Sequence, residues 1–403
     1  MSAANMYNPA TMAPPVAKTI QGRSLAIGLI FSVIAVAGAF VRPDEFFRGY
    51  LLAFMAWLGV TLGSMAVLMI RHMTGGGWGM VIRRIMGAAM RCIPLMALFF
   101  IPILFGLPRL YIWARPLETI ADQHLREHLQ EVTRSYLSIH GFILRAVFYF
   151  AIWNLLSFLL TKWSREQDQP GARDHSTRFQ AVSGPGLILY AFTISFAAID
   201  WVMSIDPSWI STIYGLLLLI GQVLSAMCFA VVVERILANY KPMSDWLKPA
   251  FVHDHGKWML TFIMVWAYFS FSQWLIIWAG NLPDEITWYL KRLNGGWGAI
   301  GLILVAFQFA VPFVMLLSRP FKRDIRRLAW LAVWLMIMRW VDLLWIIEPN
   351  FSKTISVTWA DIVVPVAMGG LWMWFFFRNL NSMPLLPVYD GDAKEVLEPA
   401  HES

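Results

Sequence analysis

The fold is decided by residues 211–233, which read STIYGLLLLIGQVLSAMCFAVVV. This stretch contains no Asp, Glu, Lys or Arg. A helix rises about 1.5 Å per residue, so the stretch is long enough to cross roughly 30 Å of hydrocarbon. It shows no sustained alternation of apolar and polar residues, which argues against a barrel strand. Residues 211–233 are therefore predicted to form a transmembrane helix.

The composition of the whole chain agrees with this interpretation. Of its 403 residues, 58% are hydrophobic and only 14% are charged, whereas soluble domains usually carry about 25% charged residues. The 32 Lys and Arg exceed the 25 Asp and Glu, but no basic patch with interleaved aromatic residues accompanies this excess. The sequence predicts a polytopic membrane protein that does not bind nucleic acid.

Nine further apolar segments lie on both sides of this stretch. Each is close to the length that a helix needs to span a bilayer. We therefore expect an all-α protein with about ten transmembrane helices. The ten segments are 24–41, 48–70, 87–107, 140–161, 185–205, 211–233, 257–279, 296–317, 328–347 and 360–377.

Both ends of the chain are predicted to be cytoplasmic tails. Residues 1–23 contain three prolines among small polar residues and lack a signal-peptide pattern, so a flexible tail is expected, and residues 381–403 form the second tail. Most Lys and Arg outside the spans fall on the side of these tails, and the loop 319–327 alone holds five. Positive residues favour the cytoplasmic side of a membrane.

The longest outer loop, residues 109–139, is predicted to contain an amphipathic helix at about 115–136. Apolar residues recur at spacings of three and four, and charged residues occupy the other face. Such a helix either docks an extrinsic partner or covers the bundle at the membrane surface. His124 and His128 lie one turn apart and could share a metal, although solvated side chains explain them more simply.

An internal repeat relates two parts of the chain that are shifted by 142 residues. Asp200 aligns with Asp342, and Asp206 aligns with Glu348, each of the latter two followed by proline. Because charge is costly within apolar segments, this match indicates duplication, with both copies crossing in the same direction. The alternative is that duplication preserved only a turn, since proline commonly follows a helix end.

The repeat predicts two related helical halves. The first half covers residues 24–233 and the second covers residues 234–380. We expect two four-helix bundles, one built from the second to fifth helices and one from the sixth to ninth helices. The first and tenth helices then pack beside these bundles.

Charged residues within the spans need a partner, a water-filled cavity or a neutral form. Arg145 and Asp200 lie at matching depth on two helices, so they are predicted to pair, with His140 nearer the outer surface. In the second half, Arg339 and Asp342 are three residues apart and can pair on one helix face. Each pair is therefore a candidate site.

These groups have a functional and a structural interpretation. Joined by water, they could form a proton path or a quinol-oxidising pocket, and an imidazole with a pKa near 6.5 accepts protons at neutral pH. Alternatively, the ion pairs only hold helices together. The quinone-pocket candidates are His140, Arg145 and Asp200. The proton-path candidates are His140, Arg145, Asp200, Asp206, Arg339, Asp342 and Glu348.

The sequence offers no ligands for a redox centre. Cys92 and Cys228 lie far apart, and neither a CxxC pair nor a CxxCH motif is present. No two histidines are expected to face each other at matching depth, as a b-type haem requires. We also find no Walker motif and no metal-ligand spacing. The chain is therefore expected to bind no haem, iron-sulfur cluster or metal.

Two stretches resemble a known family. Residues 196–215 read FAAIDWVMSIDPSWISTIYG, and residues 253–257 read HDHGK, followed by FSQ at 271–273 and IWAGNLPDE at 277–285. Both are similar to signatures of the F-type membrane subunit of alternative complex III, quinone-binding subunit 2 of quinol:cytochrome c oxidoreductase. The motif residues in the second stretch are His253, Asp254, Lys257 and Gln273.

The resemblance implies an architecture and partners. The family is related to the membrane subunit of polysulfide reductase (NrfD-like), with ten helices arranged as two four-helix bundles flanked by one helix each. In such complexes electrons pass through an iron-sulfur subunit and multihaem c-type cytochrome subunits. A homologous NrfD-like subunit is regarded as the main quinol-oxidising one. The F-type subunit would lie in a bacterial inner membrane, could bind menaquinone or another quinone, and would act in proton movement or assembly.

Three hypotheses follow for the function. The first is an integral subunit of a quinol:cytochrome c or quinol:cupredoxin oxidoreductase that contributes to quinol oxidation or proton translocation. The second is a structural membrane anchor without its own quinone or proton chemistry. The third is a secondary transporter, suggested by the repeat, although no pair of broken helices at matching midplane positions supports it.

Overall fold

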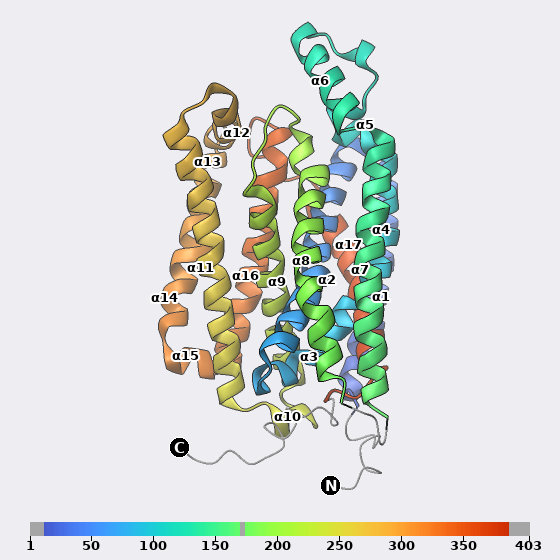
Figure 1. Cartoon of the computed structure of the whole chain (residues 1–403), viewed down its shortest axis with the longest axis vertical. Helices are drawn as coiled ribbons and strands as arrows, with labels where there is room; N and C mark the ends of the chain where they lie inside the picture. The colour runs from blue at the N-terminus through green and yellow to red at the C-terminus, as the bar shows by residue number, and fades with distance from the viewer. Residues whose placement is uncertain (1–11, 170–173, 387–403) are drawn as a thin grey trace.

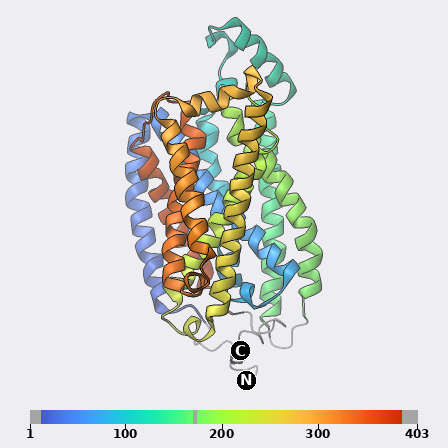
Figure 2. The same cartoon turned by 90° about the vertical axis from the view of Figure 1, so that its left-hand side faces the viewer.

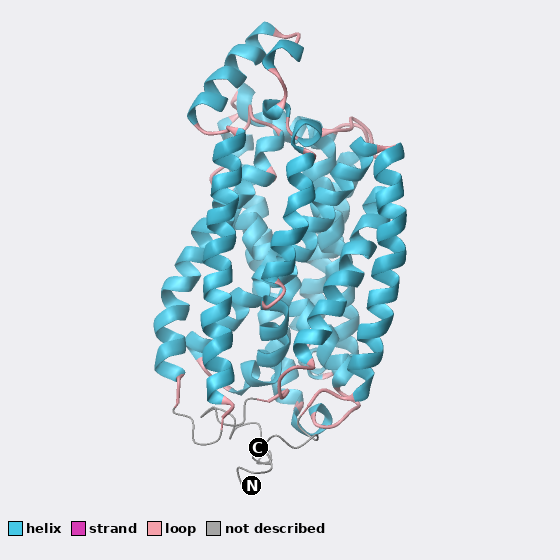
Figure 3. Ribbon diagram, turned by 90° about the vertical axis from the view of Figure 1, so that its right-hand side faces the viewer, coloured by secondary structure: helices cyan, strands magenta, loops and turns pink. Residues whose placement is uncertain are grey.

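The computed structural model describes residues 12–169 and 174–386, and the regular elements within these ranges are all helices (Figure 3). Ten of the described helices are long and apolar enough to cross a membrane. Each of the ten predicted segments coincides with one of them. The prediction of an all-α membrane protein is therefore confirmed.

Six spans belong to the first half of the chain. They are α1 (Pro15–Val41), α2 (Pro43–Thr74), a third span divided into α3 (Gly77–Met90) and α4 (Ile93–Phe105), α7 (Ile139–Gln167), α8 (Ser176–Trp201) and α9 (Tyr214–Leu237). The shorter elements are α5 (Leu107–Leu110), α6 (Gln123–Ser135), α10 (Met243–Trp246) and the 3-10 turns η3 (Ile112–Ala114), η4 (Leu117–Thr119) and η5 (Met203–Ile205).

Four spans belong to the second half. They are α11 (Pro249–Gly280), an eighth span made of α13 (Trp297–Leu304), the π-helical η6 (Val305–Ala310) and α14 (Val311–Leu317), then α16 (Ile325–Ile347) and α17 (Ala360–Leu380). The shorter elements are α12 (Pro283–Leu293), α15 (Arg319–Arg323) and the 3-10 turn η7 (Glu348–Asn350).

The spans form two four-helix bundles, as the repeat predicts. In the first bundle, α2 packs against α3, α4 and α8, and α7 packs between α4 and α8. In the second bundle, α9 packs against α11 and α16, and the eighth span contacts both α11 and α16. Contact between α2 and α9 joins the bundles, while α1 and α17 pack on each other at one side (Figure 1).

Small residues allow close approach between helices at two of these contacts. A Cβ built on Gly370 of α17 would lie 2.5 Å from the Cα of Gly28 in α1. A Cβ on Gly63 of α2 would lie 2.1 Å from the carbonyl oxygen of Gln222 in α9. In a bilayer, helices associate mainly through such tight packing, because lipid is as apolar as the side chains. These glycines therefore help to hold the flanking pair and the two bundles together.

The first helix starts earlier than expected. α1 begins at Pro15, so the prediction of a flexible tail over residues 1–23 is wrong for residues 15–23. Proline suits the first helical position because its φ angle is fixed near the helical value and its missing N–H is not needed there. The helix thus extends beyond its apolar run, past Lys18 and Arg23. Residues 1–11 and 387–403, which make up most of the two expected tails, lie outside the described residues.

The start of α1 and the end of α17 lie at the same end of the molecule, and we call the opposite end the outer end (Figure 1). There α6 projects above the bundles, and α12 lies across the top of the second bundle (Figures 1 and 2). α6 is shorter than the expected 115–136, because η4 and Pro116 precede it and Asp122 caps it by accepting from the Leu125 N–H at 3.2 Å.

Candidate functional site

The two repeat copies place a buried carboxylate at the same position. Asp200 lies one residue before the end of α8, and η5 follows, whereas Asp342 lies in the last two turns of α16, before η7. Their exposed fractions are 0% and 2%. Carboxylates this deeply buried need compensation, and the two copies obtain it differently.

Asp200 forms the ion pair with Arg145 that the sequence predicts. Nη2 of Arg145 donates to Oδ1 of Asp200 at 2.8 Å, and Nε donates to Oδ2 at 2.9 Å. Two-point contact of this kind fixes orientation and is stronger than a single hydrogen bond. Because Arg145 belongs to α7 and Asp200 to α8, the pair joins two helices of the first bundle. The prediction that they meet is confirmed.

Two tyrosines complete this cluster. The hydroxyl of Tyr149 donates to Oδ2 of Asp200 at 2.8 Å. The guanidinium of Arg145 donates to the carbonyl of Tyr136 at 3.1 Å and lies 4.0 Å from the centre of its ring. Tyr136 precedes the span, and burial together with the charge of Asp200 raises its pKa to about 12. These contacts use most of the acceptor capacity of the Asp200 carboxylate.

The structure does not bring His140 or Asp206 to this cluster. His140 is exposed and stands five residues before Arg145, a separation that places it about 140° around the helix. We placed His140 by its depth along the helix alone, without considering which way its side chain points around the helix. Asp206 forms an ion pair with Lys291 of α12 at the outer end. Of the quinone-pocket candidates, Arg145 and Asp200 therefore bind each other, while the side chain of His140 is exposed.

Asp342 pairs within its own helix, as predicted. Nη1 of Arg339 donates to Oδ2 of Asp342. Beside the carboxylate lie Trp266 of α11 and Gln308 of the π-helical η6. The Gln308 amide accepts from the Trp266 indole and donates to the Met338 carbonyl, both at 3.1 Å. Because π-helical turns are rare and often accompany functional sites, this irregular turn marks the region as a candidate.

A small cavity lies on the other side of Arg339. It measures about 140 Å³, and its lining includes Trp57, Ser225, Arg339 and Trp340, from α2, α9 and α16. Ligand pockets for drug-sized molecules usually measure about 300 Å³ or more. The cavity is therefore large enough for several waters and too small for a quinone head group with its tail.

Glu348 is buried next to a second acid that the sequence analysis missed. The exposed fractions of Glu348 and Asp361 are both 1%, and their charges interact. Neither carboxylate oxygen of Glu348 has a hydrogen-bond partner among the described residues. Asp361 accepts from the backbone N–H and hydroxyl of Thr358 at 2.7 and 2.9 Å. The sequence feature that could have revealed Asp361 is that it is an acid in the first turn of the last span.

A buried acid and histidine lie at the opposite end of the second bundle. Nδ1 of His255 is 3.0 Å from Oε2 of Glu234, and both side chains are fully buried. Nε2 of His255 lies 2.8 Å from the carbonyl of Trp78, which it meets as a donor. Nδ1 therefore faces the carboxylate within ion-pair distance, although neither Nδ1 nor the Glu234 oxygens make a hydrogen bond among the described residues. The sequence analysis missed this pair, although Glu234 is the first acid after the apolar run 211–233 and could have pointed to it.

The remaining motif residues divide between the surface and the interior. His253 and Asp254 are half-buried, and Lys257 donates to Asp254 at 2.9 Å in a partly exposed pair. Gln273 is buried, with an exposed fraction of 2%, and its amide has no partner among the described residues. The side chains of this stretch that lie in the interior are therefore Gln273 and His255, the latter standing between His253 and Lys257 in the sequence.

The described residues contain no group of three or more His, Cys, Asp or Glu side chains arranged to hold a metal ion. Cys92 and Cys228 are both buried and not bonded to each other. The chain as a whole matches no protein-family model, and no curated protein matches it. Function must therefore be argued from the geometry and from the motifs.

Proposed function

We propose that the chain is an integral membrane subunit of a quinol:acceptor oxidoreductase, akin to the F-type subunit of alternative complex III, and that it moves protons. Electrons would pass through partner subunits that carry iron-sulfur clusters and c-type haems, and quinol would be oxidised in a homologous membrane subunit. The motif stretches at 196–215 and 253–285 support the family. The complex would lie in a bacterial inner membrane with both chain ends in the cytoplasm.

The observation that carries this proposal is a series of buried titratable groups in the second half. Glu234 and His255 lie at the end where α1 begins and α17 ends, Asp342 lies deeper, and Glu348 with Asp361 lies at the outer end. Ionisable groups within a membrane are costly and usually mark ion or proton pathways. Their placement at three levels of one bundle favours a route across it.

The spacing of these groups requires water between them. Asp342 and Glu348 are six residues apart, which corresponds to about 9 Å along a helix. Gly221 of α9 lies against the guanidinium of Arg339, and Glu234 is thirteen residues further along α9, about 20 Å away. The cavity beside Arg339, which Ser225 also lines, provides room for water on this section.

The chemistry of the two ends suits proton exchange. At one end, a proton can move between the Glu234 carboxylate and the imidazole of His255 without leaving the pair. At the outer end, two buried carboxylates repel each other when both are ionised, and a shared proton removes that cost. Arg339 would keep Asp342 oriented between these ends.

The repeat supplies a matched test of this function. Glu348→Gln and Asp206→Asn each neutralise the equivalent acid of one copy. In the complex reconstituted in liposomes, we expect Glu348→Gln to lower the number of protons released per quinol oxidised, while Asp206→Asn leaves it unchanged. Equal proton yields for both variants and the wild type would exclude a proton route through the second half.

A structural anchor is the second candidate, and the Arg145–Asp200 pair favours it for the first half. That carboxylate is fully buried and held by Arg145 and Tyr149. If the anchor role applied to the whole chain, replacing Glu234, Asp342 or Glu348 by neutral side chains of similar size would leave proton release unaffected wherever the complex assembles.

A further inference from the structure

An open groove that the proposed proton route does not use lies between α9 and α16. It measures about 430 Å³, and the described residues that line it all belong to these two helices. Arg235 lies two residues before the end of α9, and Arg326 is the second residue of α16. α10 follows α9 and α15 precedes α16, and both lie opposite the outer end (Figure 1). The groove therefore has a basic end at the level where two spans leave the membrane.

Neither arginine of the groove is neutralised by the described part of the chain. The side chains of Arg235 and Arg326 make no hydrogen bond and no ion pair with the described residues, and no Asp or Glu among these residues lines the groove. Asp324 pairs instead with Arg327 at 3.4 Å, and Glu234, next to Arg235, is fully buried. A negatively charged ligand would thus meet two guanidinium groups that are free to donate to it.

The rest of the groove is apolar and reaches into the hydrocarbon. Val232 lies three residues before Arg235 on α9, and Val333 lies seven residues after Arg326 on α16, about 10 Å further from the end of the span. Trp330 also lines the groove, with an exposed fraction of 79%, and tryptophan favours the boundary between hydrocarbon and water. The polarity of the groove therefore changes along its length in the same way as that of a phospholipid.

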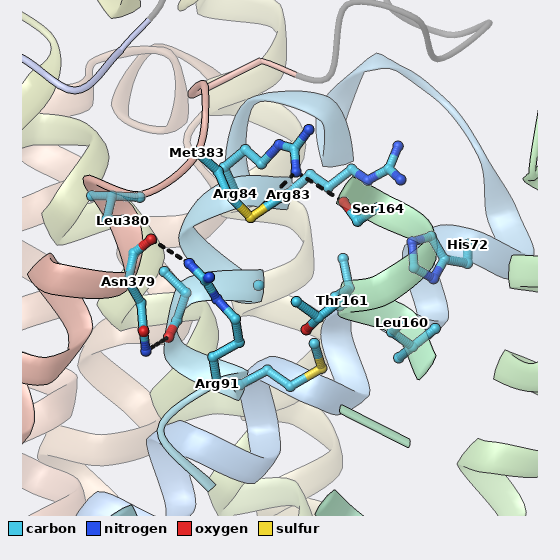
Figure 4. A pocket seen from close by; sticks show the side chains of 14 residues that line it. His72, Arg83, Arg84, Arg91, Leu160, Thr161, Ser164, Asn379, Leu380 and Met383 are labelled. Carbon is cyan, nitrogen blue, oxygen red and sulfur yellow. Dashed lines mark hydrogen bonds between the residues drawn. The ribbon is translucent and has the colours of Figure 1, made fainter. Parts of the chain in front are cut away.

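A second group of arginines, at the end of the third span, is arranged differently (Figure 4). The space beside Arg84 and Arg91 measures only about 30 Å³, room for a water and not for a head group. Arg84 pairs with Asp168 and donates to Ser164 at 2.9 Å, and Arg91 donates to the carbonyl of Asn379. These arginines are held by contacts within the chain, whereas those of the α9–α16 groove have both room and free donors.

We propose that the groove between α9 and α16 binds an anionic phospholipid. Its phosphate would lie between Arg235 and Arg326, and its acyl chains would cover Val232 and Val333. Hydrogen bonds from guanidinium groups to phosphate are among the strong ones, and basic pockets between transmembrane helices suit anionic head groups. A free phosphate would satisfy the arginines but would leave the apolar part of the groove uncovered, which favours a lipid as the source of the phosphate.

Substitutions can test the basic and the apolar part of the groove separately. Arg235→Gln and Arg326→Gln each remove one charge, and Arg327→Gln is their matched control, because it removes the same charge outside the lining. Val333→Trp fills the apolar part without changing charge. Val311→Trp on α14 is its control, since Val311 lies outside the lining and is 42% exposed, compared with 39% for Val333.

The experiment uses the full chain with its co-purifying subunits in mild detergent, washed free of lipid and titrated with phosphatidylglycerol or phosphatidylcholine. Native mass spectrometry measures how much lipid is retained. Lipid bound elsewhere on the complex contributes equally to every variant, so differences between variants report this groove. We expect the wild type, Arg327→Gln and Val311→Trp to prefer phosphatidylglycerol. Arg235→Gln, Arg326→Gln and Val333→Trp should each bind it about fivefold more weakly, roughly 1 kcal/mol.

Three outcomes would overturn this proposal. The first is equal retention of phosphatidylglycerol by the wild type and both groove arginine variants. The second is equal retention of phosphatidylcholine and phosphatidylglycerol by the wild type, which would show that the groove does not select an anionic head group. The third is displacement of the lipid by excess inorganic phosphate together with unchanged retention in Val333→Trp, which would make free phosphate, and not a lipid, the ligand of the two arginines.

Discussion

The two halves of the molecule treat equivalent acids in opposite ways. In the first half, Asp200 is held by a cation from another helix, and Asp206 pairs with Lys291. In the second half, Asp342 pairs within its own helix, and Glu348 lies near both an acid, Asp361, and a cation, Arg48, without a hydrogen bond to either. The first half therefore uses its acids to join elements, whereas the acids of the second half pair within a helix or lie beside another acid.

A single position in the repeat explains part of this difference. Ala197 occupies the position equivalent to Arg339 and is fully buried, so Asp200 has no local arginine. Its counter-charge comes from Arg145 on α7, which makes the pair an interhelical contact. Breaking the first pair should therefore damage the bundle, whereas breaking the second should mainly change the charge within α16.

The largest expected effect is loss of the interhelical pair. Arg145→Met leaves Asp200 buried without its cation and should destabilise the protein by about 3–5 kcal/mol. The double variant Arg145→Met with Asp200→Leu removes both charges and should recover most of that stability. The midpoint of thermal inactivation and the yield of assembled complex measure both. A double variant as unstable as the single one would show that the pair does more than join two helices.

The equivalent double substitution in the second half should leave assembly intact but impair proton release. Arg339→Met with Asp342→Leu removes a local pair and should assemble normally. Because it also removes the middle group of the proposed route, proton release should fall by about a hundredfold, within the range that a positioned acid or base contributes. Proton release in liposomes, compared with the repaired first-half variant, measures this. Equal rates in the two repaired variants would contradict the proposed division between the halves.

Loss of one hydrogen bond to the buried carboxylate should have a smaller effect. Tyr149→Phe removes a donor to ionised Asp200 and should cost about 2 kcal/mol, typical for a hydrogen bond to a charged group. Tyr111→Phe is the control, because its hydroxyl donates to the neutral carbonyl of Trp201 at 2.8 Å and should cost about 1 kcal/mol. Equal losses in thermal inactivation midpoint would indicate that Asp200 is not ionised.

The sequence predicts the helices and some contacts because both depend on position along a straight rod. All ten spans follow from apolar length, and Arg145 meets Asp200 because their depths match. Direction around the helix is harder to predict, because it depends on which neighbours pack there. For this reason the depth of His140 could be predicted. Its direction, on another side of α7 from Arg145, could not.

The sequence analysis missed the buried pairs for a different reason. Glu234 and His255 belong to helices that run in opposite directions, and each lies near a helix end, where polar residues are common and attract no attention. Asp361 follows an irregular segment after the second repeat motif. The π-helical turn around Gln308 changes the backbone register, which apolar periodicity does not reveal.

The smallest expected effects concern the outer acids and differ in sign. Asp206→Asn removes a partly exposed ion pair to Lys291, whose side chain is 42% exposed, so the loss of stability should stay below about 1 kcal/mol. Glu348→Gln removes a buried acid that has no hydrogen-bond partner among the described residues and whose charged form is disfavoured by burial and by Asp361, so it should raise stability by roughly 1 kcal/mol. Thermal inactivation of the two variants in parallel measures both. Because the residues occupy equivalent repeat positions, a loss of stability in Glu348→Gln as large as in Asp206→Asn would mean that Glu348, too, is held by a cation.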